Sequence, residues 1–221
     1  VIEAVKHGFT AIAPDTCGQH IPVSGENASS KAIFDNTYFD YLAQDELGHE
    51  NCVKFTDIDE PLCKQWFFWA IGDTVIANSV LRSEEHTDAD KIGITGLSWG
   101  GVITTTAACF DYRYAFAVPI YHGFYVAESL LSDLGLGSNE KANTLWQDPS
   151  ILKKCPVPIL MLAGDSDACC TVNCNVKTYH TCTNGYFIIR PWLEHGDMEA
   201  ISTDEPYRFG RYITGLGLGF I

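Results

Sequence analysis

The chain has 221 residues, of which 46% are hydrophobic, enough for one sizeable core with little room for a second. Its formal net charge of -14 disfavours a nucleic-acid partner and adsorption to an anionic membrane, because both need an excess of Lys and Arg. No apolar run approaches the roughly 18 residues that span a bilayer. We therefore expect neither a nucleic-acid nor a membrane partner, and the oligomeric state stays open.

The first eight residues are typical of the end of a helix that stops at Gly8, and not of a signal peptide. A chain that opens inside a helix leads us to expect one domain, residues 1–221, shortened at its amino end. The short apolar run at residues 9–14 ends in turn residues and predicts a strand. Residues 15–62 are polar and rich in Asp, Asn, Gly and Ser, which indicates a long surface or lid excursion.

Helical and strand patterns then alternate to the end of the chain. Helices are expected at residues 62–82, 100–109, 172–179 and 206–214. Further strands are expected at residues 91–95, 115–121, 157–163 and 186–190. Residues 122–154 form a second excursion. Near-continuous apolar strands separated by helices are typical of a parallel sheet covered on both faces. The expected fold class is therefore α/β, a doubly wound and mostly parallel sheet of five strands.

The pentapeptide Gly96-Leu97-Ser98-Trp99-Gly100 falls between an expected strand and an expected helix. In that context G-x-S-x-G is the nucleophile elbow of α/β-hydrolases, a tight turn that presents a serine above a helix N-terminus. We expect side chains at positions 96 and 100 to collide with neighbouring main chain. Ser98 is thus the expected nucleophile, and the N–H of Trp99 an expected oxyanion donor.

A serine hydroxyl needs a base to take its proton, and in this fold the base follows a later strand. His195 meets that condition, just after the strand expected at 186–190. His122 follows its strand too early to be the base, and either lines the substrate pocket or has a structural role, the latter being favoured. The orienting carboxylate should lie after the strand at 157–163, where Asp165 and Asp167 are both available. The spacing leaves the choice open, and the other Asp would shape the turn.

Nine cysteines are present, four of them between residues 169 and 182. A zinc site on Cys170-x-x-x-Cys174 would need two further ligands at matching spacing. Candidates are Cys169, Cys182, His180 and His195, but no paired knuckle appears. We therefore expect no metal and no cofactor. Plain thiols and at least one disulfide both remain open.

Several of these motifs together resemble those of acetyl xylan esterases and dienelactone-hydrolase-like proteins, over residues 62–214. The similar segments are residues 90–101, 111–121, 148–150 and 164–167. The resemblance implies a serine carboxylesterase acting on small-molecule or carbohydrate esters, among them acetyl esters. In such proteins the acid is usually the third residue after the glycine, which favours Asp167. Dienelactone hydrolases proper use a Cys nucleophile, so Ser98 departs from their chemistry.

The resemblance also implies further N-terminal strands and a loop, often His-Gly-Gly-like, that supplies a second oxyanion N–H. No such loop precedes residues 9–14. One alternative function is a serine peptidase of the prolyl-oligopeptidase type, whose pocket residues 121–123 and the second excursion would shape. Another is a non-catalytic binding protein with a hydrolase fold, against which the complete Ser, Asp, His order argues.

Overall fold

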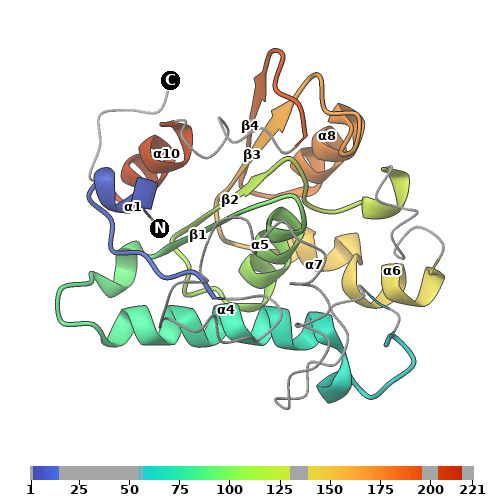
Figure 1. The fold of residues 1–221 in the computed structure, drawn as a ribbon, viewed down its shortest axis with the longest axis horizontal. Coiled ribbons are helices and arrows are strands. Elements are labelled where there is room, and N and C mark those ends of the chain that lie inside the picture. The colour runs from blue at the N-terminus through green and yellow to red at the C-terminus, as the bar shows by residue number, and fades with distance from the viewer. Residues whose placement is uncertain (1, 15–54, 56, 130–138, 196–203, 216–221) are drawn as a thin grey trace, which may run out of the picture.

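The computed structural model describes residues 2–14, 55, 57–129, 139–195 and 204–215 (Figure 1). Its helices are α1 (Ile2–Lys6), α4 (Trp66–Ser83), α5 (Trp99–Phe110), α6 (Glu140–Trp146), α7 (Pro149–Lys154), α8 (Val172–Thr181) and α10 (Glu205–Ile213). Three short 3-10 turns, η1 to η3, occupy Leu62–Lys64, Ala89–Lys91 and Val126–Glu128. The strands are β1 (Gly93–Leu97), β2 (Phe116–Ile120), β3 (Ile159–Gly164) and β4 (Gly185–Arg190).

The four strands form one parallel sheet in the order β1-β2-β3-β4. Since connections between parallel strands are right-handed and this order never reverses, the crossover helices gather on one face. There α5 packs against β1 and β2, and α8 against β3 and β4. The other face is covered by α10, whose Phe209 ring lies 6.1 Å from Phe116 and 5.0 Å from Tyr186. Figure 1 shows α8 and α10 on opposite sides of β3 and β4. The α/β fold expected from the sequence, a parallel sheet with helices on both faces, is confirmed.

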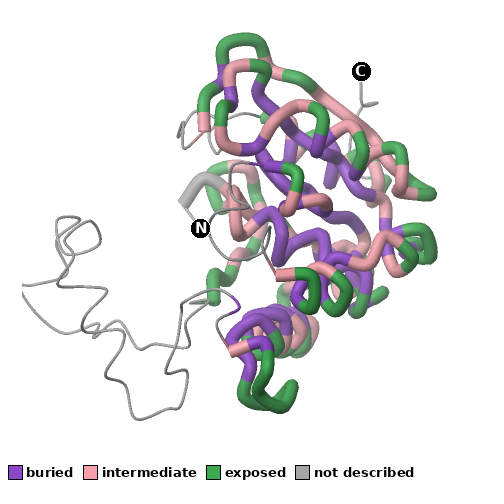
Figure 2. The backbone as a smooth tube through the Cα atoms, turned by 90° about the vertical axis from the view of Figure 1, so that its right-hand side faces the viewer, coloured by how far each residue is buried: buried purple, intermediate pink, exposed green. Residues whose placement is uncertain are grey.

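The core lies at the two inner strands and the helix that crosses them. Every residue of β2 and of β3 is buried, whereas β1 and β4, at the edges of the described sheet, are mostly half-buried. Nine residues of α5 are buried, which its small and β-branched side chains permit by allowing a close approach to the sheet. Figure 2 shows buried residues gathered in the interior of the molecule, with exposed residues on its outer turns.

The long helix α4 is fixed to the sheet layer by polar contacts as well as by its apolar face. Asn78 donates a hydrogen bond to the buried carboxylate of Asp111 at 2.9 Å, and the hydroxyl of Tyr114 donates to the carbonyl of Thr74 at 2.7 Å. Arg113 binds the same carboxylate through two nitrogens, each at 2.7 Å. These contacts join α4 to the turn between α5 and β2. They therefore fix the C-terminal end of α5, the helix that follows the elbow.

The strand expected at residues 9–14 is not formed. Helix α1 ends as predicted at Gly8, whose φ of 82° is the left-handed conformation that glycine favours. The following residues line a cavity of about 710 Å³ together with residues of β1. They pair with none of the four strands of the described sheet, and a strand is stabilised by backbone hydrogen bonds to a neighbouring strand. The described residues therefore contain four strands where the sequence predicted five.

The two expected excursions are described in part. Of the first, residues 15–54 and 56 lie outside the described part of the chain; of the second, residues 130–138 do. The described remainder of the second excursion carries helices α6 and α7, which the sequence analysis did not anticipate. Within the described residues, no helix is both long and apolar enough to cross a membrane.

Candidate active site

Ser98 forms the turn between β1 and α5 in a conformation that few side-chain-bearing residues adopt. Its φ is 53° and its ψ is -117°, and its N–H donates a hydrogen bond to the carbonyl of Ile120 at 3.0 Å. Positive φ at a residue with a side chain costs on the order of 1–3 kcal/mol and persists only where the surroundings impose it. Here the end of β2 holds the turn, and the turn places the serine at the N-terminus of α5.

Two glycines allow this turn to form. Gly96 is one of the two positions predicted to be tight, but the other is Gly101 and not Gly100. A Cβ at Gly96 would overlap the carbonyl of Gly100, as predicted. A Cβ at Gly100 would meet nothing within 4 Å, so the predicted collision at that position is wrong. The second tight position is Gly101, where a Cβ would overlap the carbonyl oxygen of His122 and lie 2.9 Å from that of Ile120. The close approach of α5 to β2 therefore depends on Gly101.

The structure brings together three side chains that the sequence placed after three different strands. Ser98 Oγ lies 2.9 Å from His195 Nε2, and His195 Nδ1 lies 2.9 Å from Asp167 Oδ2. An ionised carboxylate only accepts hydrogen bonds, so Nδ1 carries the imidazole proton and Nε2 is left to accept from the serine hydroxyl. Such a chain of contacts can take the proton from a serine and hold the resulting imidazolium beside a negative charge.

The two aspartates after β3 have different surroundings. The side chain of Asp167 is fully buried, and its Oδ1 accepts hydrogen bonds from the N–H groups of Cys169 at 2.8 Å and Cys170 at 2.7 Å. Asp165 is exposed, and its Oδ1 accepts from the backbone N–H of Trp192 at 2.6 Å. Asp167 therefore contacts the imidazole, while Asp165 ties the turn after β3 to the segment that leads to His195.

Two further residues, which the sequence analysis missed, position the imidazole. Tyr121, directly after β2, has a φ of 71°, is fully buried, and lies with its ring 5.2 Å from that of His195. At the end of β3, a Cβ on Gly164 would overlap the carbonyl oxygen of Leu193, so the glycine lets the loop that carries His195 come close. The signal available in the sequence was position, since each residue stands at the carboxyl end of a strand.

His122 lies inside the protein and not in an open pocket. The residue is fully buried, its Nδ1 accepts the N–H of Gly123 at 2.9 Å, and its Nε2 lies 3.3 Å from Ser129 Oγ. Burial lowers the pKa of His122 to about 4, so the ring is neutral at physiological pH. A substrate cannot reach this ring in the conformation described. Of the two roles considered for His122, the structure therefore supports the structural role and not substrate binding.

Trp99 is the first residue of α5, so its backbone N–H belongs to the helix N-terminus, where the peptide dipoles favour negative charge. Its indole ring points into an aromatic group, 5.8 Å from the ring of Phe55 and 6.4 Å from that of Trp66. The side chain thus packs into the core while the backbone faces the turn. This arrangement agrees with a backbone role for Trp99.

Comparison with known proteins gives one family and a set of related folds. The profile of the dienelactone hydrolase family matches residues 2–185. Among curated protein sequences, none matches the chain. Among solved structures, acetyl xylan esterase 1 from a Thermoanaerobacterium species superposes with a TM-score of 0.57 at 18% identity, over 74% of this chain and 58% of that one.

Two peptidases superpose to a similar extent. The Pyrococcus horikoshii acylaminoacyl peptidase gives a TM-score of 0.55 at 23% identity, over 71% of this chain and 29% of that one. A puromycin-hydrolyzing peptidase from Mycobacterium tuberculosis gives 0.56 at 18% identity, over 68% and 25%. The chain thus spans about three-fifths of the esterase and less than a third of either peptidase. At these identities the likeness establishes the fold.

Proposed function

The chain belongs to the dienelactone hydrolase family, and on that basis we propose that it is a serine hydrolase that cleaves carboxylic esters through an acyl-enzyme. The observation that carries the proposal is the 2.9 Å contact between Ser98 Oγ and His195 Nε2, made by a serine that is held at positive φ. A strained serine that is hydrogen-bonded to an oriented imidazole is typical of an activated nucleophile.

In the proposed first half-reaction, Ser98 Oγ forms a bond to the ester carbonyl carbon while His195 Nε2 takes the hydroxyl proton. The buried carboxylate of Asp167 stabilises the imidazolium without itself taking the proton. The tetrahedral intermediate then collapses, the bond to the alcohol oxygen breaks, and His195 returns the proton to the departing alcohol. The acyl group is left on Ser98.

In the second half-reaction, water attacks the acyl-enzyme and His195 accepts its proton. The acid is released when Ser98 Oγ recovers a proton from the imidazolium. Negative charge develops on the carbonyl oxygen in both halves of the reaction. We assign its stabilisation to the N-terminus of α5, with the N–H of Trp99 as one donor. Removing a single oxyanion donor typically lowers the rate by about 100- to 1000-fold, so this assignment carries a large share of the proposed catalysis.

For the substrate, we propose acetyl esters of carbohydrates or small-molecule esters. The support is the sequence resemblance to acetyl xylan esterases and the similarity of the fold to an acetyl xylan esterase. Ser98 also stands where dienelactone hydrolases proper carry cysteine, which favours ester cleavage by an alkoxide over thiolate chemistry. The peptidase neighbours favour one second candidate, cleavage of a peptide amide in the manner of the prolyl-oligopeptidases.

A fluorophosphonate probe tests the nucleophile, because it reacts with a serine only where a base activates the hydroxyl. We expect the full-length protein to be labelled and the Ser98→Ala variant to be blank. Ser166→Ala is the matched control: this serine lies beside the site but bonds Asp165 and not the imidazole, so its removal should leave labelling intact. Absence of labelling in the wild-type protein would favour the non-catalytic binding protein instead.

Rates on acetyl esters and on Pro-containing peptide amides then separate the two candidate reactions. We expect acetylated sugars and small acetyl esters to be hydrolysed and the amides to be left intact. Faster cleavage of the amides would replace the esterase assignment with the peptidase one, while leaving Ser98 and His195 in the same roles.

A further inference from the structure

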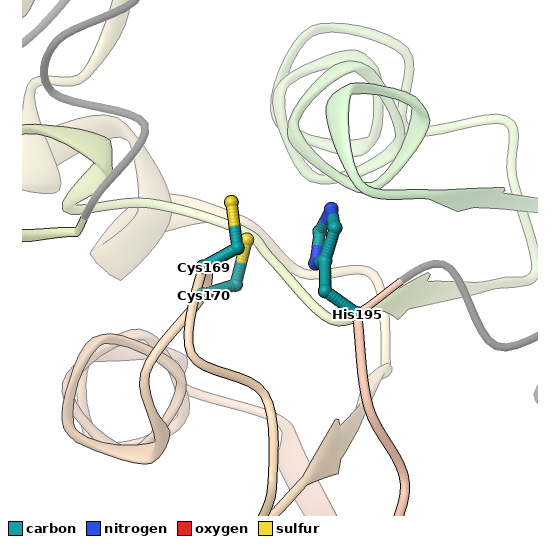
Figure 3. Close-up of side chains that lie close together, drawn as sticks. All are labelled: Cys169, Cys170 and His195. Atoms are coloured by element: carbon teal, nitrogen blue, oxygen red, sulfur yellow. The ribbon is translucent and has the colours of Figure 1, made fainter.

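Two thiols lie beside the imidazole of His195, and the proposed reaction uses neither. Cys169 and Cys170 belong to the loop after β3, whereas His195 belongs to the loop after β4. The two sulfur atoms and one imidazole nitrogen all lie within 4.8 Å of one another. Figure 3 shows both thiols projecting to the same side of their loop, beside the imidazole of His195. The three side chains therefore surround one small volume.

The carboxylate of Asp167 holds this group together. One of its oxygens accepts the N–H groups of Cys169 and Cys170, and the other lies 2.9 Å from His195 Nδ1. The loop that bears the thiols and the imidazole of His195 are thus both hydrogen-bonded to the buried side chain of Asp167. Cys170 is fully buried and Cys169 is half-exposed, so an ion from solvent has an approach from the Cys169 side.

We propose that Cys169, Cys170 and His195 form a binding site for a thiophilic divalent cation, Zn²⁺. Two thiolates and one imidazole are ligands that zinc prefers, and three protein ligands leave its fourth position open to water. Burial raises the pKa of the Cys170 thiol, so Zn²⁺ must displace its proton on binding. With Zn–S bonds of about 2.3 Å and Zn–N bonds of about 2.0–2.1 Å, tetrahedral ligands lie about 3.5–3.8 Å apart. The ligand atoms here lie within 4.8 Å of one another, so they need to close by up to about 1 Å. This requires rotation of the half-exposed Cys169 side chain and a turn of the imidazole that takes one of its nitrogens away from Ser98 or Asp167.

The zinc spacing considered in the sequence paired Cys170 with Cys174 and offered Cys169 and His195 only among the possible further ligands. In the structure Cys174 Sγ lies 3.3 Å from Thr171 Oγ1, on the buried side of α8. The third ligand comes instead from a loop on the next strand of the sheet. The proposal departs from the expectation of no metal but not from that of no cofactor, since this ion acts on the site as an inhibitor.

Binding of Zn²⁺ here switches the proposed hydrolase off. Both imidazole nitrogens are already engaged, Nε2 with Ser98 and Nδ1 with Asp167. An ion on Nε2 takes the base from Ser98. An ion on Nδ1 removes the hydrogen bond to Asp167 and leaves Nε2 protonated, so that it cannot accept the serine proton. This inhibition rests on the proposed function, whereas the binding of the ion does not.

Binding is tested first, with the metal-free full chain and without reference to activity. Titration with Zn²⁺ by calorimetry should give one ion per chain, and Co²⁺ as a spectroscopic substitute should give a sulfur-to-cobalt charge-transfer band. We expect Cys169→Ser to weaken Zn²⁺ binding by at least about 10-fold, the size of loss typical even for outer-shell metal partners. Cys63→Ser is the matched control, because Cys63 is an exposed thiol on a different element, and it should bind as the wild type does.

Cys170→Ala gives a second, independent measurement if the buried position tolerates the change, and Cys169→Ser suffices if it does not. Retained Zn²⁺ affinity and a retained cobalt band in Cys169→Ser would overturn the site, as would the absence of binding by the wild-type chain. Equal losses in Cys63→Ser would do the same, since they would place the ion elsewhere.

Inhibition is tested second, on the hydrolysis of a small acetyl ester. We expect Zn²⁺ to suppress the wild-type rate and a chelator to restore it. The Zn²⁺ concentration that halves the rate, measured against each variant's own metal-free rate, should rise at least about 10-fold in Cys169→Ser and stay unchanged in Cys63→Ser. A protein that binds Zn²⁺ through these ligands but hydrolyses nothing would refute the proposed function and keep the site. An active enzyme insensitive to Zn²⁺ would refute the inhibition.

Discussion

Asp167 reaches His195 across 28 residues of chain, with its Oδ2 2.9 Å from the imidazole Nδ1. The contact is made by a carboxylate with no exposed side-chain surface, whose second oxygen is occupied by two backbone N–H groups of its own loop. Each oxygen thus has a partner in the folded protein. The imidazole is consequently held in one tautomer and one orientation, which is the condition for Nε2 to face Ser98.

We expect Asp167→Asn to lower kcat by about 10⁴-fold with little change in KM. An amide at this position can donate to Nδ1 and so stabilise the wrong tautomer, and a loss of that size is typical when the triad carboxylate is replaced by its amide. Steady-state kinetics on an acetyl ester measure this effect. Asp165→Asn is the control, because an amide oxygen still accepts the N–H of Trp192, and its loss should stay below about 10-fold. A larger loss at Asp165 than at Asp167 would reverse the assignment.

We expect Gly101→Ala to be clearly destabilising and Gly100→Ala to be tolerated, although only Gly100 belongs to the G-x-S-x-G motif. The added Cβ at Gly101 overlaps the carbonyl of His122, and backbone cannot move aside as a side-chain tip can. Overpacking of this kind costs about 1–3 kcal/mol, whereas alanine in an open helical position is favourable. Urea unfolding of both variants measures the difference. Equal free energies of unfolding would contradict the geometry of this turn.

We expect Gly164→Ala to impair activity more than stability. Its Cβ overlaps the carbonyl of Leu193, and the loop that this residue shares with His195 must retreat. A displacement of about 1 Å at a catalytic group can cost on the order of 100-fold in rate. The decisive measurement is kcat alongside the free energy of unfolding. Gly72→Ala, in open space on α4, is the control and should leave kcat unaltered. A fully active Gly164→Ala would show that the loop does not position the imidazole.

We expect His122 to make the protein less stable as the pH falls from 6.5 toward 4. Burial, opposed by the charge of Asp167, lowers the pKa of His122 to about 4, while the unfolded chain titrates near its ordinary value of about 6.5. In that window the unfolded state binds a proton that the folded state does not, so stability is lost on acidification and levels off below pH 4. The loss over the whole window is about 3 kcal/mol.

The variant His122→Asn removes this titration and keeps an acceptor for the N–H of Gly123. Its free energy of unfolding should fall by about 2 kcal/mol less than that of the wild type between pH 6.5 and 4.5. The slope with pH is the readout, since the substitution also changes the absolute stability. Parallel slopes would mean that His122 is charged in the folded protein or that it titrates normally.

The sequence alone was sufficient for the order of the four strands, for the helices that pack on the sheet and for the elbow. Apolar runs of strand length and helical periodicity report burial that is local to each segment, and they predicted β1 to β4, α4, α5, α8 and α10 within a few residues. The run at 9–14 has the same local pattern, but it pairs with no strand of the described sheet. A strand forms only where a second segment accepts and donates its backbone hydrogen bonds, and a local sequence pattern does not reveal that partner.

The amino-acid sequence by itself determined an α/β sheet with Ser98, His195 and a nearby aspartate after its strands, because strand ends in a parallel sheet share one edge. Only the tertiary structure decided which aspartate meets the imidazole, that Gly101 is the tight glycine of the turn, and that His122 is buried. It alone placed two cysteine thiols against His195. These outcomes depend on the directions of side chains that leave different loops, and residue spacing along a chain carries no information about those directions.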